Sequence, residues 1–506
     1  MRADGNVGEM ARVGFGWLAG GRLATQIVHL ANSVILARLL APEDFGLLAM
    51  ALAVGGLARA VGDFGVSAIV VQRGELPQRF LDAAFSLNLA VFLAIALVQV
   101  LLAPVGAVLM KEPRLAPVMV SLAAVLPFSG IAALFQALLR RELRFNKVVT
   151  VNLLRVVTMT GTACTLAACG FGVWSLVLGM AVSAVLEAVV TGKLTGAHPR
   201  VDLGAVLSHR QEIVQFGKFA TGNSLINYFV HNADYLLVGR LLSTADLGFY
   251  SFAYERSRLV NARILDLVAS VSFPAFARIK FDLNRLREAY LKVTLGGFAI
   301  IAPATAFLAV FAPIVIPLVF GKKWTAAVLA FQILSVHVLF NAATSGGGSV
   351  IYAVGRPDVT FRVMRWTVVP LVAAYYVGAK TGGIEGVAVA VVLIKSASSC
   401  LFIWTVYRHV GWRAWPILRP LILILVGALA AAGGSALVAG RIGSGSDWLV
   451  LAVAATVFSI LYLSFQLLIN RKALGLIWQG LLGESGATWC RNRLPPAIRS
   501  LLAMPV

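Results

Sequence analysis

The sequence predicts an all-α polytopic membrane protein with about 14 transmembrane helices. Two parallel six-helix lobes are expected around a central cavity, with two additional helices after the second lobe. Three observations lead to this prediction: a strongly apolar composition, an internal repeat, and an alternation of positive charge between successive loops. Together they indicate a membrane protein that arose by duplication.

The composition excludes an ordinary soluble protein. Of the 506 residues, 59% are hydrophobic and only 13% are charged. Soluble proteins carry about a quarter charged residues, so this chain cannot cover itself with polar surface. Its apolar runs have the length of about 20 residues that a membrane-crossing helix requires. The strands of a membrane β-barrel alternate over about ten residues instead, so helices are favoured.

About fourteen apolar segments follow one another along the chain. They lie near residues 14–37, 45–71, 83–109, 115–138, 148–169, 171–192, 219–240, 246–275, 292–320, 325–354, 361–379, 384–407, 416–440 and 448–469. The expected parts of the chain are an N-terminal lobe at 1–200, a C-terminal lobe at 201–410, two additional helices at 411–470 and a basic cytoplasmic tail at 471–506.

The stretch Trp17–Met50 occurs a second time, without a gap, as Phe219–Phe252. About ten of the paired positions are identical, including His29 with His231 and an Arg-Leu-Leu-x3-Asp-x-Gly motif in both copies. Each copy is expected to form a helix, a turn and a second helix. An even number of spans separates the copies, so both enter the membrane from the same side. The lobes are therefore predicted to be parallel repeats.

The formal net charge of +21 would suggest a nucleic-acid partner in a soluble protein. Here the basic residues fall mainly in short loops, so membrane topology explains them and no nucleic-acid partner is expected. Loops after an even number of spans, together with both termini, carry about 28 Lys and Arg, and the other loops carry about 8. This bias predicts that both termini lie in the cytoplasm.

No pattern of an enzyme, a metal site or a cofactor site is found. The four cysteines, Cys164, Cys169, Cys400 and Cys490, do not have metal-ligand spacing. No G-x-x-x-x-G-K-[ST] motif for nucleotide is present. The largest loop expected outside the membrane, Lys193–Lys218, is too short for a soluble catalytic domain. Catalytic residues, metals and cofactors are therefore not expected.

Ionisable residues within the expected spans are the candidate functional groups. Placing one at mid-bilayer costs about 2.5–3.5 kcal/mol, so it normally faces a cavity or a partner. They are concentrated in spans 1, 2, 7 and 8, which are equivalent pairs in the two lobes. These residues are Arg22, Arg59, Asp63, Arg155, Glu187, Asp234, Glu255, Arg256, Arg258, Arg263, Asp266 and Lys395.

Four of these arginines, Arg22, Arg59, Arg256 and Arg258, are the candidates for binding an anionic substrate in the cavity. A guanidinium group offers phosphate two parallel hydrogen bonds as well as charge. The alternative is that spacing of three or four residues pairs an arginine with an acid on its own helix. Arg59 has this spacing from Asp63, and Glu255 has it from Arg258.

Three acids, Asp63, Asp234 and Glu255, are the candidates for binding a coupling ion. His29 and His231 coincide in the repeats, and Asn32 coincides with Asp234 one turn later. A histidine near a carboxylate inside the membrane can carry a proton. The alternative is that these side chains only form hydrogen bonds between helices.

Several motifs carry a family resemblance. They are Arg38-Leu-Leu-Ala-Pro-Glu-Asp-Phe-Gly46, Gly62-Asp-Phe-Gly65, Gln72-Arg73, Asp234-Tyr235, Gly239-Arg-Leu-Leu-Ser-Thr-Ala-Asp-Leu-Gly-Phe-Tyr250, Phe273-Pro-Ala-Phe-Ala-Arg278 and Phe320-Gly-Lys-Lys-Trp324. With them the chain resembles Wzx-type polysaccharide flippases of the multidrug/oligosaccharidyl-lipid/polysaccharide (MOP) exporter superfamily. The resemblance covers about residues 10–470.

The resemblance implies alternating access between two six-helix lobes. The usual substrate of these flippases is an undecaprenyl-pyrophosphate-linked oligosaccharide. They turn it across the bacterial cytoplasmic membrane in exopolysaccharide, capsule or O-antigen synthesis. The expected partners are this substrate, membrane lipids and the polymerase or export machinery. The related lipid II flippase has cavity arginines in spans 1, 2 and 8, and the nearest matches here are Arg22, Arg59, and Arg256 or Arg258.

Two other functions remain as alternatives. A cation-coupled multidrug antiporter of the same superfamily would need an acidic and aromatic cavity, whereas arginines predominate in spans 1, 2 and 8. An integral-membrane polysaccharide polymerase or ligase would need a large exported loop, whereas the outer loops are short. A flippase is therefore the favoured prediction.

Overall fold

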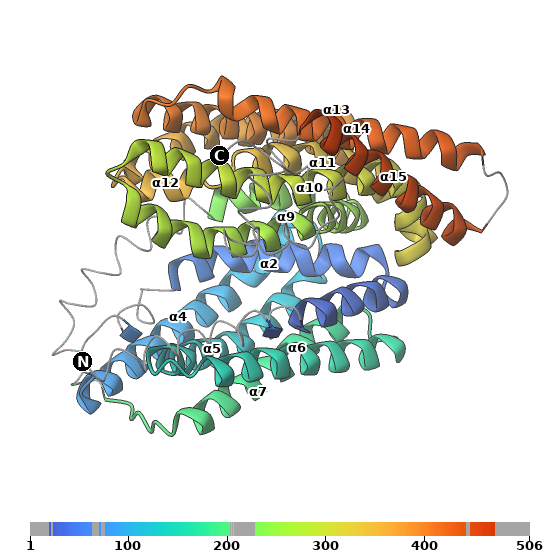
Figure 1. Cartoon of the computed structure of the whole chain (residues 1–506). Helices are drawn as coiled ribbons and strands as arrows, with labels where there is room; N and C mark the ends of the chain where they lie inside the picture. Colours follow the sequence, from blue (N-terminus) through green and yellow to red (C-terminus); the bar gives the residue numbers. More distant parts are fainter. Residues whose placement is uncertain are drawn as a thin grey trace. The chain divides into compact units, whose positions relative to one another are not determined.

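The computed structural model describes residues 20–21, 24–62, 70–71, 76–202, 204, 206, 228–441 and 446–470, and its regular elements in these ranges are all helices (Figure 1). The helices are 24–39, α2 (Pro42–Gly62), α4 (Gln78–Met110), α5 (Leu115–Arg141), α6 (Phe145–Ala168), α7 (Val173–Thr195), 228–241, α9 (Thr244–Ile279), α10 (Leu283–Phe320), η1 (Lys322–Ala327), α11 (Val328–Ala343), α12 (Gly347–Ala353), α13 (Pro357–Val410), α14 (Trp415–Arg441) and α15 (Asp447–Ile469).

Among the described residues, nine helical segments are long and apolar enough to cross a membrane. The longest of these, Trp366–Val410, contains two of the expected spans joined by a kink at Gly382–Gly383. The all-α polytopic fold is confirmed. The total of about 14 spans stays a prediction, because the first, second and seventh expected spans fall partly outside the described residues.

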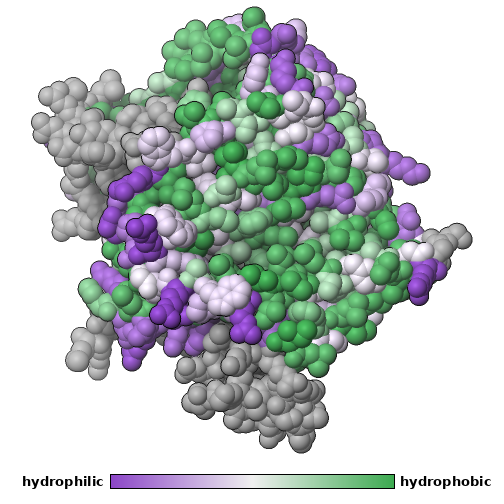
Figure 2. All heavy atoms as spheres, turned by 90° about the horizontal axis from the view of Figure 1, so that it is seen from above, coloured by the Kyte–Doolittle hydropathy of each residue, from purple (hydrophilic) through white to green (hydrophobic). Residues whose placement is uncertain are grey.

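The surface also fits a lipid environment. Large apolar side chains point outward along the helices, such as Val108 at 80% exposure and Val369 and Leu437 at 75%. Soluble proteins rarely expose contiguous apolar patches of more than a few hundred Å². Figure 2 shows hydrophobic residues over the middle of one face, with hydrophilic residues gathered mostly toward its two ends. This distribution is the one that a bilayer requires of a protein that spans it.

The chain divides into two compact units, Met1–Gly248 and Phe249–Val506. In the first unit α5 packs on α4 and α7, and α6 packs on α7. The expected boundary between residues 200 and 201 stays a prediction. The structure groups residues 228–248 with the first unit, where the Tyr228 hydroxyl donates to the carbonyl of Ala53 in α2.

In the second unit α10 packs against α11, α14 and α15, so the two additional helices attach to this unit. Within the segment expected at 325–354, α11 ends at Ala343 and α12 begins at Gly347, with Gly346 between them in the left-handed region at φ +82°. The kink in α13 brings Gly378 against Gly386, where an added Cβ would lie 2.4 Å or less from a backbone oxygen. Glycine is required at both positions because the two backbones touch.

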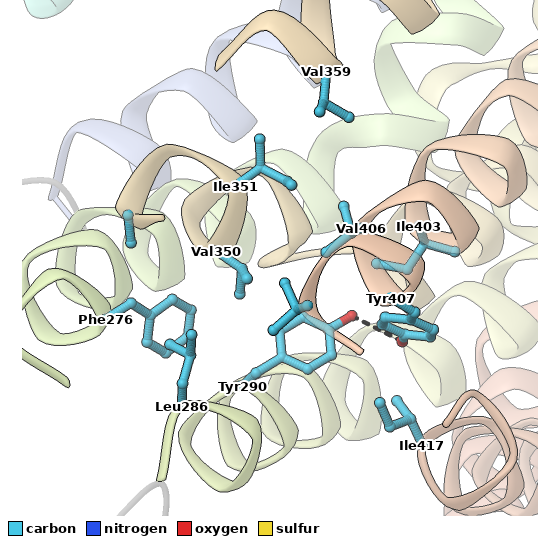
Figure 3. Packing of buried hydrophobic residues seen from close by; sticks show 12 residues of the cluster. Phe276, Leu286, Tyr290, Val350, Ile351, Val359, Ile403, Val406, Tyr407 and Ile417 are labelled. Atoms are coloured by element: carbon cyan, nitrogen blue, oxygen red, sulfur yellow. Dashed lines mark hydrogen bonds between the residues drawn. The ribbon is translucent and has the colours of Figure 1, made fainter. Parts of the chain in front are cut away.

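Aromatic residues fill the second unit near the start of α10 (Figure 3). The hydroxyls of Tyr290 and Tyr407 lie 3.2 Å apart, and the ring of Trp412 lies beside both. Phe276 and Leu286 complete the cluster from α9 and α10. Both tyrosines are buried, and the shared hydrogen bond satisfies their hydroxyls inside an apolar environment.

The duplicated stretch has the same local structure in both copies. Leu40 N donates to Leu36 O at 2.8 Å, and Leu242 N donates to Val238 O at 2.9 Å. The repeated aspartate then caps the next helix. Asp44 Oδ2 accepts from Ala41 N at 2.9 Å, and the equivalent Asp246 accepts from Ser243 N at 3.2 Å. The motif is therefore a helix-capping turn, and the arginines within it, Arg38 and Arg240, are exposed.

The two repeated turns also pack against each other within the first unit. A Cβ added to Gly46 would lie 1.8 Å from Thr244 O, and one added to Gly248 would lie 1.9 Å from Pro42 O. Thr244 Oγ1 further donates to Glu112 Oε2 in the α4–α5 loop at 2.8 Å. The repeated glycine is thus explained by a backbone contact that leaves no room for a side chain.

Candidate functional site

The structure describes only part of the expected binding set. Arg22 and Asp63 lie outside the described residues, and Arg59 lies on α2 with its side chain outside them. Asp234 is fully buried on the helix 228–241, where its Oδ1 accepts from Tyr235 N at 3.0 Å. Glu255 is exposed on α9. The expected cavity between the lobes and the roles of these residues stay predictions.

Helix α9 is long enough to cross a bilayer, and it carries several charged side chains along its middle. Arg256 and Arg258 are two residues apart, about 200° around the helix, so they point in different directions. The guanidinium carbon of Arg256 lies 5.4 Å from the ring centroid of Phe252 and 5.9 Å from that of Phe320. Both rings are therefore close enough for a cation–π contact with Arg256.

Arg258 instead lies on Tyr254, one helical turn earlier on α9. Its guanidinium carbon is 5.2 Å from the tyrosine ring centroid, and its Nη1 donates to the hydroxyl at 3.4 Å. Lys395 of α13 donates to the same hydroxyl at 3.1 Å. The sequence indicated Lys395 as a charge inside a span but gave it no place in the site. The four-residue spacing of Tyr254 from Arg258 was the available signal for the tyrosine.

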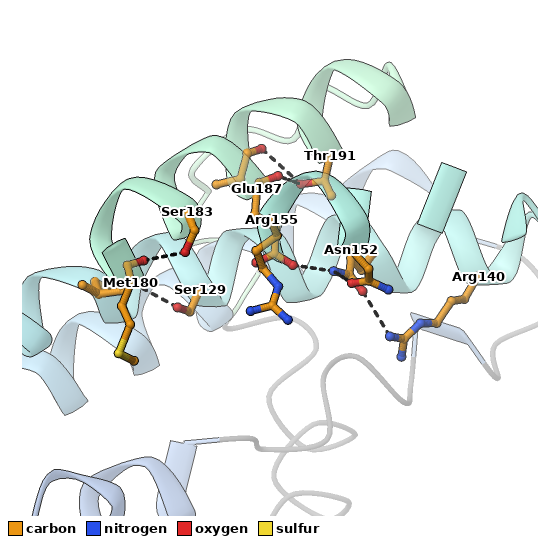
Figure 4. A network of polar contacts seen from close by, with 11 residues as sticks. Ser129, Arg140, Asn152, Arg155, Met180, Ser183, Glu187 and Thr191 are labelled. Atoms are coloured by element: carbon orange, nitrogen blue, oxygen red, sulfur yellow. Dashed lines mark hydrogen bonds and ion pairs between the residues drawn. The ribbon is translucent and has the colours of Figure 1, made fainter. Parts of the chain in front are cut away.

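The first unit holds a second polar network inside its helices (Figure 4). Glu187 of α7 accepts from Gln136 of α5 and lies 3.6 Å from Arg155 Nε of α6. Gln136 in turn accepts from Arg140 at 3.1 Å, and its amide nitrogen lies 3.4 Å from Asn152 Oδ1. The sequence indicated Arg155 and Glu187 separately, in different spans. The structure brings them together, and this pair neutralises its own charge.

These groups can bind an anion but have no arrangement for metal chemistry. Within the part of the chain that the structure describes, no group of three or more His, Cys, Asp and Glu side chains could hold a metal ion. The guanidinium and ammonium groups of α9 and α13 are donors with positive charge, which suits phosphate oxygens. The described residues therefore include guanidinium and ammonium groups on α9 and α13, and their role in binding an anion stays a prediction.

The model of one protein family, described as polysaccharide biosynthesis protein, matches residues 35–329. The lipopolysaccharide biosynthesis protein WzxC of Escherichia coli K12 is 28% identical over 395 residues, covering 77% of this chain and 80% of that protein. The succinoglycan biosynthesis transport protein ExoT of Rhizobium meliloti is 26% identical over 402 residues, covering 78% and 79%. The range that the family model matches includes the capping turns and the charged region of α9.

Two solved structures have the same fold. The lipid II flippase MurJ, in an inward closed conformation, superposes with a TM-score of 0.75 at 13% identity, covering 90% of this chain and 99% of that one. An inward-facing multidrug resistance MATE transporter of the MOP superfamily gives 0.61 at 17% identity, covering 76% and 94%. These similarities confirm the resemblance predicted from the motifs. The chain belongs to the polysaccharide biosynthesis protein family and has the fold of the MOP superfamily.

Proposed function

We propose that this protein flips a lipid-linked oligosaccharide, carried on undecaprenyl pyrophosphate, across the bacterial cytoplasmic membrane by alternating access. The observation that supports the proposal is that this chain of the polysaccharide biosynthesis family carries Arg256 and Arg258 on α9, each with its guanidinium group against aromatic rings. Their aromatic partners hold two guanidinium groups, which are suited to phosphate. The lipid tail would stay in the bilayer, and the sugar would pass between the lobes.

The remaining expected residues complete this proposal. Arg22 and Arg59 would bind the same pyrophosphate from the N-terminal lobe, and Asp63, Asp234 or Glu255 would bind a coupling ion. Full burial of Asp234 supports a role for it, because ionisable side chains inside membrane proteins often mark ion pathways. The protein would act as a transporter and not as an enzyme, with both termini in the cytoplasm and with the polymerase or export machinery as its partner.

The test is polymer export in a bacterial strain that lacks its own flippase and makes a matching lipid-linked oligosaccharide. Arg256→Ala is expected to lower export at least about tenfold, because it removes a charge-assisted contact with phosphate. Arg22→Ala should give a similar loss. Arg285→Ala is the matched control, because Arg285 lies in the first turn of α10 and its side chain is 77% exposed. This variant should leave export unchanged.

Membrane insertion of each variant is measured by the amount of full-length protein in the membrane fraction. Undiminished export when both Arg22 and Arg256 are changed to alanine would contradict the role of the cationic residues. Failure of the wild-type chain to restore export of any lipid-linked oligosaccharide, together with drug resistance in the same strain, would favour the multidrug antiporter instead.

A further inference from the structure

The first unit contains an acid inside its helices, Glu187 of α7, that has no part in binding the substrate. The amide of Gln136 in α5 donates to Glu187 Oε1, and the guanidinium Nε of Arg155 in α6 lies 3.6 Å from Glu187 Oε2 (Figure 4). The second distance is longer than a hydrogen bond, so the arginine contributes its charge without donating a proton. Among the described residues, the carboxylate therefore has one hydrogen-bond donor and one cation.

These contacts leave an ionised carboxylate incompletely satisfied. Its two oxygens offer about four acceptor positions, whereas a protonated carboxyl group has fewer to fill because one oxygen becomes a donor. The side chain of Glu187 is only 14% exposed, so water does little to make up the difference. A buried charge needs close pairing and further hydrogen bonds to offset the loss of water. The ionised form of Glu187 therefore depends on Arg155.

The partner of Glu187 has room to move away from it. The side chain of Arg155 is 35% exposed, more than twice the exposure of Glu187. Arg155 lies ten residues after Phe145, where α6 begins, and Glu187 lies eight residues before Thr195, where α7 ends. At a rise of 1.5 Å per residue these depths are about 15 and 12 Å. Both groups therefore lie within a hydrocarbon core that is about 30 Å thick.

Polar side chains connect Glu187 to one end of the helices. Gln136 accepts from Arg140 Nη2 at 3.1 Å, and its amide nitrogen lies 3.4 Å from Asn152 Oδ1. Arg140 is exposed in the last turn of α5, at the end that the loop charges predict to be cytoplasmic. Rows of polar side chains inside membrane proteins serve as routes for protons. Glu187 is therefore within reach of a proton that enters from this end.

We propose that Glu187 binds and releases a proton during transport, with the proton and the Arg155 guanidinium alternating as partners of its carboxylate. Uptake forms an O–H bond at Oε2 and breaks the ion pair with Arg155. Release returns the proton to water, and the ion pair forms again. This inference rests on the proposed function and names a proton as its coupling ion. It places that ion at an acid outside the set of Asp63, Asp234 and Glu255.

The helices α2, α5 and α6 pack against α7, so their charges decide when Glu187 binds a proton. Among the described residues, the one charged group that pairs with its carboxylate is Arg155. Lys147 donates to the carbonyl of Leu194 instead, at 3.2 Å. The other charged residues of these four helices are Glu43, Asp44, Arg59, Arg140, Arg141 and Lys193, and the side chain of Arg59 lies outside the described part of the chain.

Infrared difference spectroscopy of the purified full chain in lipid nanodiscs tests the proposal, since a protonated carboxyl group has a C=O band that a carboxylate lacks. Between pH 8 and pH 5 the wild type is expected to gain a band that Glu187→Gln does not gain. Arg155→Gln is expected to show this band at both pH values, because loss of the cation favours the neutral acid. Glu142→Gln is the matched control, because Glu142 is an exposed glutamate just after α5, and it should behave like the wild type.

Polymer export in the strain that lacks its own flippase gives a second measurement. Glu187→Gln is expected to lower export at least about tenfold, because glutamine can neither take up nor release a proton. Glu187→Asp retains a carboxyl group and should export more polymer than Glu187→Gln. Glu142→Gln should export like the wild type. The amount of each variant in the membrane fraction and its thermal unfolding show whether the variant is folded.

The outcomes separate the proton site from the proposed function. If no band depends on Glu187, or if Glu187→Gln exports polymer like the wild type, the proton site is overturned while export by the wild type upholds the proposed function. A band that changes with pH in Arg155→Gln as it does in the wild type also overturns the alternation with Arg155. If the band changes as expected and the wild-type chain restores no export of any lipid-linked oligosaccharide, the proposed function fails and the protonation of Glu187 stands.

Discussion

The charged side chains described on α6 and α7 have contacts of a different kind from those on α9 and α13. Arg155 and Glu187 pair with each other inside the first unit, so their charges cancel where they lie. Arg256, Arg258 and Lys395 in the second unit contact aromatic rings and a phenol instead. A pair that cancels contributes to helix packing, whereas the contacts of these three cations with aromatic rings are attractions between a charge and a neutral group.

A residue outside the membrane spans gives a pH-dependent prediction. Hydrogen bonds from Arg114 and Thr244 lower the pKa of Glu112 from 4.5 to about 2. A lowered pKa in the folded state means that this stabilisation is complete above pH 4.5 and is lost as the pH falls toward 2. Glu112→Gln is therefore expected to destabilise the protein by about 1–3 kcal/mol at pH 7 and by less near pH 3.

Thermal unfolding of the detergent-solubilised protein at both pH values measures this difference. Glu142→Gln is the control, because Glu142 pairs with Arg144 in an exposed loop and such pairs contribute little. A melting-temperature difference between wild type and Glu112→Gln that is the same at pH 7 and pH 3 would contradict the assignment of the ionised carboxylate to this contact.

At the scale of elements, the capping turns and their glycines decide how the repeated helices join. At the start of both α2 and α9, a backbone N–H donates to the repeated aspartate. Each copy of the repeat therefore forms its turn from local sequence. The contact between the two turns is different in kind, because it joins residues about 200 positions apart. It depends on glycine at 46 and 248, where the backbones touch.

Gly248→Val is expected to destabilise the protein by about 1–3 kcal/mol or more, because its Cβ would overlap the carbonyl oxygen of Pro42. The melting temperature and the monodisperse yield in detergent should both fall. Gly296→Ala is the matched control in α10, where an added Cβ meets nothing within 4 Å. It should be neutral or slightly stabilising, because alanine favours a helix over glycine. Equal melting temperatures for the two variants would rule out the close contact.

At the scale of the whole molecule, the loop charges predict which side of the membrane each turn faces. The Ser243 turn carries little positive charge, whereas the α12–α13 connection has Arg356 and Arg362 around Asp358. In a cysteine-free variant, Ser243→Cys should react with a membrane-impermeant maleimide added to spheroplasts. Asp358→Cys should react only after permeabilisation. The reverse labelling pattern would place both termini outside the cytoplasm.

The sequence by itself determined that the chain is an all-α membrane protein with an internal repeat. It also indicated the family and a helix, a turn and a second helix in each copy of the repeat. These features depend on composition, on periodicity or on contacts within a few residues, so the sequence alone is enough to predict them. The resemblance of the motifs added the proposed substrate class.

Only the tertiary structure decided which charges meet. Lys395 reaches a tyrosine 141 residues earlier in the chain, and Gln136 reaches Glu187 51 residues later. It also separated Arg256 from Arg258, which the sequence treated as equivalent candidates. The sequence shows that a charged residue lies within an expected span. Its contact partner depends on how the helices rotate and pack, which local sequence does not encode.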